Sequence, residues 1–191
     1  MKLRKLQSDT DFEYLRQIKN QDFQDVLIHA VTGGGKSKCP LIAFHRLKRK
    51  NLVDKLCIVV PRDTLKEQFA RSALEGIDLY GRRIICELNE STNEIDPSRG
   101  TDGYITTYQA LAADRALINA FEFKRSRYLL ALDECHHVGM GSSFEKGLTP
   151  LIENSSHRLF MTGTLERGDH RPIAFLPYES INGEDTDVIQ N

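Results

Sequence analysis

The chain has 191 residues, of which 40% are hydrophobic and 28% charged, and its formal net charge is −1. This length suits one α/β domain with a buried core, and the near-neutral charge argues against strong free-standing affinity for nucleic acid, because phosphate contacts depend on Lys and Arg. The longest apolar run, Leu56 to Pro61, is too short to span a membrane, and no apolar signal-peptide stretch follows the basic N-terminus, so we expect a cytoplasmic protein with no membrane partner.

Short apolar runs rich in β-branched residues alternate along the chain with segments of helical spacing. In chain order, the expected strands are Val26–Ala30, Leu56–Val60, Ile84–Cys86, Gly103–Thr107, Tyr128–Leu132 and Arg158–Met161. The expected helices are Leu41–Lys50, Asp63–Leu74, Tyr108–Phe121 and Phe144–Asn154. The stretch 89–103 and the region after Gly163 are expected to be irregular. This alternation predicts an α/β fold in which helices cover both faces of a parallel sheet.

The segment Ala30 to Ser37 matches the phosphate-binding pattern GxxxxGK[ST], except that alanine stands at the first position. Glycines let successive backbone N–H groups turn toward a phosphate, Lys36 can reach the β- and γ-phosphates, and the Ser37 hydroxyl can ligate Mg²⁺. The predicted ATP contacts are Thr32, Gly33, Gly34, Gly35, Lys36 and Ser37. The alternative is a glycine-rich turn with a chance lysine. It does not account for the preceding strand, the spacing and the following helix together.

If the segment Ala30 to Ser37 binds Mg-ATP, an acidic residue is also needed to hold the metal ion. Asp133 and Glu134 stand at the end of the apolar run Tyr128–Leu132. The aspartate can hold Mg²⁺ together with Ser37, and the glutamate can orient and deprotonate the attacking water. We therefore expect Lys36, Asp133 and Glu134 to be the catalytic residues. A helix N-cap with an acidic first turn is the alternative for this pair.

The string Asp133-Glu134-Cys135-His136 follows the pattern DExH. Here the chain resembles the first RecA-like lobe of superfamily 2 helicases, in the DEAH-like or type III restriction-enzyme helicase-subunit group. Alanine at position 30 fits this family, whose first motif often reads AxTGxGK[ST]. Three more segments resemble family motifs in the family's order: Val59–Gln68 (motif Ia), Ile105–Gln109 (the TTYQ element) and Met161–Thr164 (motif III). The resemblance covers residues 12–178 and implies a RecA-like P-loop NTPase fold.

The resemblance also implies roles for residues outside the nucleotide site. Along the nucleic-acid groove it places Pro61, Arg62, Thr106 and Thr107. As residues that couple this groove to the nucleotide it implies His136, Thr162 and Thr164. The alternatives are ordinary strand-end and turn chemistry for the threonines, and a capping or surface role for the histidine.

Two departures from the family pattern stand out. Leu165 follows motif III where proline is usual, although the later Arg167-Gly168-Asp169 resembles type III-like and mobile-element helicases. A glutamine that reads adenine is expected upstream of the P-loop, commonly within a string like LRxYQ. The nearest candidate is Tyr14-Leu15-Arg16-Gln17, which is out of pattern. It makes Gln17 the expected adenine contact.

Motifs IV to VI belong to a second RecA-like lobe and do not occur before Asn191. We expect residues 1–180 to form the first lobe and residues 181–191 to be a polar tail or linker. The second lobe would come in cis or in trans and supply the arginine finger that hydrolysis needs. The resemblance implies single- or double-stranded nucleic acid as the partner, with DNA favoured over RNA.

The leading interpretation is the ATP-binding lobe of a helicase or translocase that couples Mg-ATP hydrolysis to strand movement. A stand-alone nucleotide-binding switch or docking module is the alternative. It has no need for the groove residues. A P-loop kinase would need a phosphoacceptor pocket, and the DExH string followed by Thr-Gly-Thr argues against it.

Overall fold

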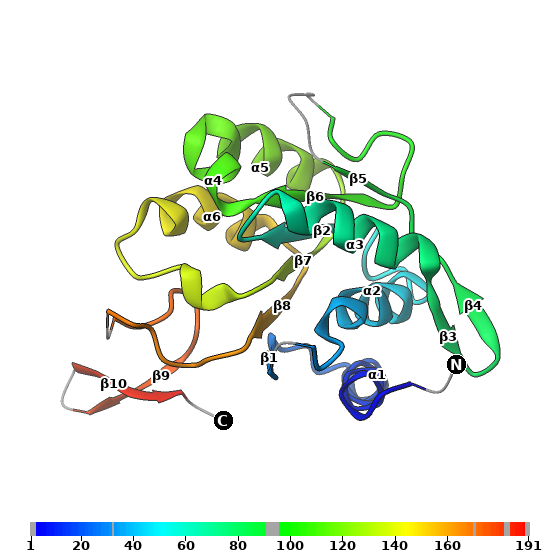
Figure 1. Ribbon diagram of the computed structural model, residues 1–191, viewed down its shortest axis with the longest axis horizontal. Coiled ribbons are helices and arrows are strands. Elements are labelled where there is room, and N and C mark those ends of the chain that lie inside the picture. The colour runs from blue at the N-terminus through cyan, green and yellow to red at the C-terminus, as the bar shows by residue number, and fades with distance from the viewer. Residues whose placement is uncertain (1–2, 32, 91–95, 170, 182–183, 190–191) are drawn as a thin grey trace.

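Six parallel strands form the central sheet of the protein, in the order β1-β8-β7-β2-β6-β5 (Figure 1). The computed structural model describes residues 3–31, 33–90, 96–169, 171–181 and 184–189. The strands of this sheet are β1 (Val26–His29), β2 (Lys55–Val60), β5 (Leu88–Glu90), β6 (Gly103–Thr107), β7 (Tyr128–Leu132) and β8 (His157–Thr162). The predicted α/β fold with a parallel sheet is confirmed.

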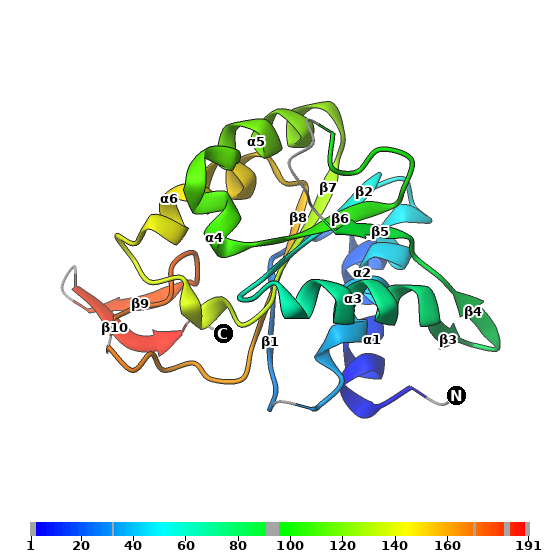
Figure 2. The same cartoon turned by 45° about the horizontal axis from the view of Figure 1, so that its top comes forward.

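Helices cover both faces of the sheet (Figures 1 and 2). They are α1 (Lys5–Asn20), α2 (Cys39–Lys48), α3 (Thr64–Glu75), α4 (Tyr108–Ala110), α5 (Ala116–Arg125) and α6 (Ser143–Asn154). Strand β2 shows why both faces are apolar: Ile58 packs in the core under α1 to α3, and Val59 packs in the core under α4 to α6. In the described part of the chain, no helix has both the length and the apolar character needed to cross a bilayer.

The parallel arrangement brings distant segments to one edge of the sheet. Strand β8 lies between β1 and β7, with Leu159 opposite Val26 and Leu132 opposite Phe160. The carboxyl ends of these three strands therefore meet at one edge, where open α/β sheets bind their ligands. The P-loop follows β1, the acidic pair follows β7, and motif III follows β8.

The structure also contains elements that the sequence did not predict. Helix α1 precedes the first expected strand, and β5 forms an edge strand within the stretch expected to be irregular. Of the expected strand Ile84–Cys86 only Ile84 lies in a strand, at the end of an antiparallel hairpin outside the main sheet that β3 (Ile77–Leu79) forms with β4 (Arg82–Ile84). The turn residues Tyr80 and Gly81 both have positive φ, as short hairpin turns require.

A second hairpin follows motif III, in the region expected to be irregular. Strand β9 (Tyr178–Ile181) pairs antiparallel with β10 (Glu184–Ile189). The hairpin spans position 180, where we expected the lobe to end. That boundary stays a prediction.

Candidate nucleotide-binding site

The P-loop leaves β1 and enters helix α2 through a 3-10 turn, Lys36–Lys38. Gly33 and Gly35 have φ of +83° and +91°, a backbone region that favours glycine. A side chain at Gly35 would also come within 2.9 Å of the Gln7 amide nitrogen. The loop therefore has the glycine-dependent shape expected of a phosphate-binding turn. Thr32, one of the predicted ATP contacts, lies outside the described residues.

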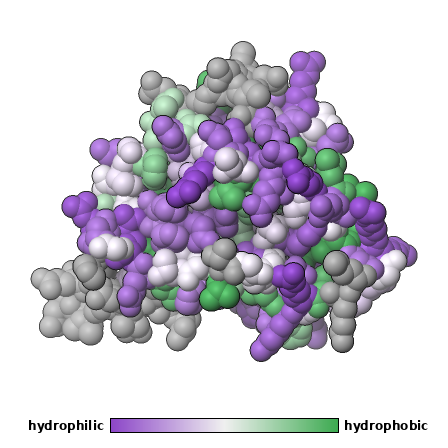
Figure 3. Space-filling model, in the orientation of Figure 1, coloured by the Kyte–Doolittle hydropathy of each residue, from purple (hydrophilic) through white to green (hydrophobic). Residues whose placement is uncertain are grey.

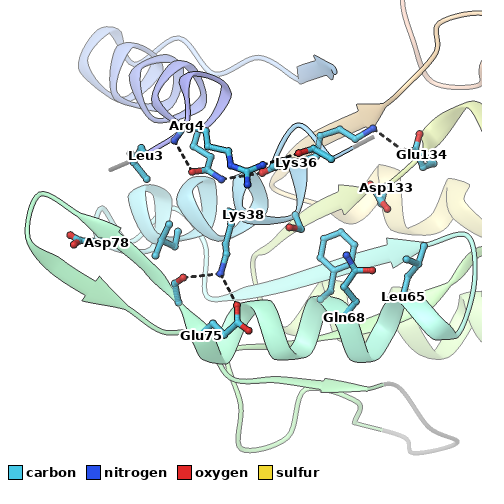
Figure 4. Close-up of a pocket in the computed structure, with 17 residues that line it drawn as sticks. Leu3, Arg4, Lys36, Lys38, Leu65, Gln68, Glu75, Asp78, Asp133 and Glu134 are labelled. Carbon is cyan, nitrogen blue, oxygen red and sulfur yellow. Dashed lines mark hydrogen bonds and ion pairs between the residues drawn. The ribbon is translucent and has the colours of Figure 1, made fainter. Parts of the chain in front are cut away.

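Lys36 and Glu134 form an ion pair at the centre of the site (Figure 4). The Nζ atom of Lys36 lies 2.9 Å from Oε1 of Glu134, and the lysine side chain is 8% exposed. A buried ammonium group is costly unless it is paired, so the carboxylate stabilises the lysine in this position. The two residues are 98 positions apart in sequence and meet because β1 and β7 end at the same edge.

The two carboxyl groups after β7 have opposite pKa shifts. Burial, followed by the neighbouring Glu134 charge, raises the pKa of Asp133 to about 6. Burial also acts to raise the pKa of Glu134, but hydrogen bonds from Lys36 Nζ and the Gly163 N–H outweigh it, so this pKa is lowered. Two adjacent carboxyls whose environments separate their pKa values are typical of catalytic sites.

Glu134 has an unusual backbone conformation for a residue with a side chain, with φ of +48°. Such a conformation costs energy and persists where the surroundings enforce it, often at functional sites. Here the side chain is held from two sides, because the Gly163 N–H donates to Oε2 at 2.8 Å and Lys36 donates to Oε1. The carboxylate is therefore fixed in orientation between the P-loop and motif III.

The DExH string and motif III are also in contact through His136. Its Nδ1 atom lies 2.9 Å from Oγ1 of Thr162 and 3.4 Å from Oε2 of Glu134. The Thr162 hydroxyl donates to the Thr164 carbonyl at 2.6 Å. Burial, with a contribution from His137, lowers the pKa of His136, so a neutral imidazole is favoured there at neutral pH. The three residues predicted to couple the two sites thus form one chain of contacts.

The site opens into a cavity of about 550 Å³ between the P-loop, α1 and α3 (Figure 4). At one end it is lined by Lys36, Ser37, Asp133 and Glu134. The opposite end is lined by Leu3, Glu75 and Asp78, and Arg4 and Gln7 line the cavity beside the P-loop glycines (Figure 4). The P-loop and the acidic pair therefore line the same cavity, as a shared Mg-ATP site requires. Apolar and polar side chains line the rest of the cavity.

Gln7 is a site residue that the sequence analysis missed. Its side-chain nitrogen donates to the Gly35 carbonyl at 3.3 Å, and its side-chain oxygen accepts from the Arg4 N–H at 3.1 Å. The Arg4 guanidinium in turn donates to the Gly33 carbonyl at 2.8 Å. The segment Leu3-Arg4-Lys5-Leu6-Gln7 itself has the form LRxYQ with leucine in place of tyrosine. This match was available in the sequence.

Gln17, the glutamine expected to read adenine, lies away from this cavity. Its nitrogen donates to Glu13 Oε1 at 2.8 Å, and its oxygen accepts from the Gln24 N–H at 3.3 Å. It is buried near the end of α1, where the first contact lies within the helix and the second links the helix to the segment that leads into β1. The expectation for Gln17 is therefore corrected: Gln7, ten residues earlier, occupies the P-loop end of the same helix.

The residues predicted to line a nucleic-acid groove separate into two groups. Arg62 is exposed and Pro61 half-buried, at the turn between β2 and α3. Thr106 and Thr107 are buried, and the Thr106 hydroxyl has no access to solvent. Thr107 Oγ1 accepts from the Ala110 N–H and caps α4. The places of these four residues along a nucleic-acid groove stay a prediction.

Thr106 is buried because it shares the sheet face of Tyr104, which packs under α4 to α6. Its Oγ1 atom has no hydrogen-bond partner. The structure thus assigns a capping role to one threonine and a packed position to the other, the strand-end chemistry that was the alternative in the sequence.

The residues at the phosphate end fit Mg-ATP by their chemistry. A buried lysine, a serine hydroxyl and two carboxyls line one wall, beside a turn whose glycines have positive φ. Among the described residues, no three His, Cys, Asp or Glu side chains gather to hold a metal ion. Mg²⁺ usually keeps few protein ligands and completes its shell with phosphate oxygens and water. A site with only Ser37 and Asp133 as ligands therefore suits Mg²⁺ that arrives with a nucleotide.

Comparison with known proteins agrees with this geometry. An uncharacterized protein of Mycobacterium leprae is 28% identical over 155 residues, which are 81% of this chain and 25% of that protein. The Sulfolobus solfataricus SWI2/SNF2 ATPase core in complex with dsDNA aligns with a TM-score of 0.61 and 19% identity, over 86% of this chain and 32% of that one. The Type ISP restriction-modification enzyme LlaGI in complex with a DNA substrate mimic gives 0.59 and 19%, over 92% and 19%.

These likenesses confirm the RecA-like fold. The chain spans about a quarter of the length of the curated relatives it matches. The family model of the type III restriction enzyme, res subunit, matches residues 1–167, which include the P-loop, the DExH string and motif III. The resemblance predicted from the motifs is thereby confirmed, and the chain belongs to the family of type III restriction enzyme res subunits, within the superfamily 2 helicases.

Proposed function

We propose that this chain is the ATP-binding lobe of a nucleic-acid-dependent ATPase, a helicase or translocase that couples Mg-ATP hydrolysis to movement along a strand. The observation that carries the proposal is the meeting of Lys36 with Glu134 at 2.9 Å, with Asp133 and the P-loop lining the same cavity. A lysine, a metal-binding carboxyl and a base at one sheet edge are the groups that phosphoanhydride hydrolysis requires.

Each residue of the site has a separate role in the proposed hydrolysis, set by its position. Lys36 exchanges its Glu134 partner for phosphate oxygens, which frees the carboxylate to accept a proton from water. The Gly163 N–H keeps Oε2 of Glu134 in place during this exchange, because its hydrogen bond is independent of the lysine. Asp133 and Ser37 would hold Mg²⁺, which neutralises charge on the phosphates when bound.

Gln7 supports adenine as the base of the nucleotide. Its amide nitrogen donates to the P-loop carbonyl of Gly35, and its amide oxygen accepts from the Arg4 N–H. One N–H and one lone pair remain, and this pair of groups is complementary to the N7 and N6 edge of adenine. The assignment moves the adenine contact from Gln17 to Gln7.

Nucleic acid is the proposed partner, with DNA favoured over RNA. Two of the structural relatives are in complex with DNA or a DNA substrate mimic, and the exposed Arg62 just before α3 offers a phosphate contact. The face over α3 is mostly hydrophilic (Figure 3). Contacts of this kind position a strand without reading its sequence.

A second RecA-like lobe, in cis or in trans, completes the proposed enzyme. Arg167, which follows motif III, is not free to act as an arginine finger, because its guanidinium is engaged by the His136 carbonyl and the Asp169 carboxylate. An arginine from another lobe would then supply the transition-state charge.

The proposal is tested by linkage between the two ligands. The affinity for Mg-ATP is measured by fluorescence titration with and without a single-stranded oligonucleotide, at two salt concentrations. A motor lobe shows a nucleotide affinity that depends on the oligonucleotide, and reciprocal dependence of oligonucleotide affinity on the nucleotide. Tight Mg-ATP binding with no linkage would instead identify a nucleotide-binding switch.

A further inference from the structure

Arg167 joins the segments that follow β7 and β8. Its Nη1 atom donates to the His136 carbonyl, while Nε and Nη2 donate to the two carboxylate oxygens of Asp169, each at 2.9 Å. The arginine side chain is only 15% exposed. The three nitrogen atoms of the guanidinium group thus all donate to acceptors within the protein. These contacts fix the orientation of the arginine side chain.

The backbone around Gly139 leaves room for this guanidinium. A Cβ atom at Gly139 would lie 2.7 Å from both Cζ and Nη2 of Arg167. On either side the two segments are joined by backbone contacts, with the Ala174 N–H donating to the Val138 carbonyl at 2.8 Å and Gly139 bridging Ile173. The arginine therefore lies in a space that the missing Cβ of Gly139 leaves open, between two segments that backbone contacts hold together.

The carbonyl that Arg167 holds belongs to the residue that links the acidic pair to motif III. His136 Nδ1 contacts Thr162 Oγ1 at 2.9 Å, and the next residue, Gly163, donates its N–H to Glu134 Oε2 at 2.8 Å. The contacts form a ring that runs from Glu134 through Gly163 and Thr162 to His136, with Arg167 fixing the His136 backbone. Displacing Arg167 would weaken these contacts, although Arg167 itself makes no contact with the substrate.

We propose that Arg167 is a positioning residue, which holds His136 against Thr162 and thereby keeps the Gly163 N–H on the Glu134 carboxylate. Asp169 orients the guanidinium, and Gly139 provides the space for it. The inference rests on the proposed function, since it gives this ring the task of orienting the base. Arginine is needed because its planar fork meets both oxygens of the carboxylate while a third N–H reaches the carbonyl, a fixed geometry that the single nitrogen of a lysine does not reproduce.

A pair of glycine substitutions tests this without removing any polar group. Gly139→Ala places a methyl group where the guanidinium lies, and the mobile end of the arginine side chain must move away. Gly168→Ala is the matched control, because a Cβ there meets nothing within 4 Å and neither glycine has a positive φ. Arg167→Ala and Arg167→Lys complete the set.

The first measurement is amide hydrogen exchange at Gly163, followed by NMR in the 191-residue chain. We expect exchange to accelerate about tenfold in Gly139→Ala and Arg167→Ala, as the loss of one hydrogen bond to a charged group implies, with partial recovery in Arg167→Lys. Gly168→Ala should match the parent, and amides in β2 should be unchanged in all variants. Equal exchange at Gly163 in Gly139→Ala, Arg167→Ala and the parent would overturn the proposal.

The second measurement is turnover by the chain together with its second lobe. Displacing Arg167 should lower kcat about tenfold and leave the KM for ATP unchanged, because the ring orients the base and makes no nucleotide contact. Parallel loss in KM and kcat would contradict a positioning role. If the parent itself does not bind Mg-ATP, the proposed function fails, while the exchange measurement still decides whether Arg167 holds the ring.

Discussion

The Nζ atom of Lys36 lies 2.9 Å from Oε1 of Glu134, so the P-loop lysine and the carboxylate after β7 neutralise each other before any nucleotide arrives. A phosphate group must compete with Glu134 for this ammonium group. Removing Glu134 would free the lysine for phosphate, whereas removing Lys36 would remove the phosphate contact itself.

Substitution of the two partners should change nucleotide affinity in opposite directions. Lys36→Ala should weaken Mg-ATP binding by about 1.5–3 kcal/mol, the usual contribution of a charge-assisted contact. Glu134→Gln should bind Mg-ATP at least as tightly as the parent, because the lysine loses a charged competitor. Titration with a fluorescent ATP analogue measures both, and Gln17→Ala serves as a distant control. Weaker binding in Glu134→Gln would show that the ion pair does not compete with phosphate.

The raised pKa of Asp133 predicts a stability change with pH. A carboxyl whose pKa rises from 3.8 unfolded to about 6 folded binds its proton more tightly in the folded state, so it destabilises the fold as pH increases through this window. Asp133→Asn removes this penalty, which amounts to at most about 3 kcal/mol above pH 7. Urea unfolding at pH 5 and pH 8 should show the variant gaining stability over the parent, more so at pH 8. An equal difference at both pH values would contradict the shift.

The contacts of Gln7 predict base selectivity. Gln7→Ala should reduce the preference for ATP over GTP by about tenfold, since it removes hydrogen bonds that discriminate the two bases. Gln17→Ala should leave this ratio unchanged. Competition of ATP and GTP for the fluorescent nucleotide gives the ratio in each variant. A loss of selectivity in Gln17→Ala alone would return the adenine contact to the position first expected from the sequence.

The separation of the groove residues predicts different outcomes for Arg62 and Thr106. Arg62→Ala should weaken binding of single-stranded DNA and reduce the salt slope by about 0.7, as expected for one lost phosphate contact on a single strand. Thr106→Val should leave DNA affinity unchanged and be neutral or stabilising, because it replaces a buried hydroxyl that has no partner. A Thr106→Val variant with lower DNA affinity and unchanged stability would show that this threonine does face the strand.

The phosphate end of the site could be predicted from sequence because each motif has a local geometric cause. The P-loop needs glycines between a strand and a helix. Asp133 can be recognised because it comes directly after a fully apolar strand. Once the strands are parallel, their carboxyl ends share an edge, so the meeting of Lys36 with the acidic pair follows from topology. Their mutual ion pair does not, since it depends on side-chain positions that no spacing rule fixes.

Helix α1 shows what the sequence concealed. Its buried side carries Gln7, Thr10, Asp11 and Gln17, so the apolar period that predicts an amphipathic helix is weak. Two of these polar groups have partners far along the chain: Asp11 forms a bidentate pair with Arg46, and Gln7 donates to the Gly35 carbonyl. Likewise, the edge strand β5 is three residues long and gains its partner only from β6. Such elements depend on tertiary contacts that a local pattern does not contain.

On the proposed function, this lobe hydrolyses ATP only as part of a two-lobed, nucleic-acid-stimulated motor. The decisive measurement is steady-state phosphate release by the 191-residue chain, alone and together with the second lobe, with and without a single-stranded oligonucleotide, with Glu134→Gln as the inactive control. We predict very slow release by the chain alone, a rise on the order of 10³-fold or more with the second lobe as its arginine completes the site, and further stimulation by the oligonucleotide. Rapid release by the short chain alone, independent of the oligonucleotide and abolished by Glu134→Gln, would contradict the account and identify a self-sufficient NTPase.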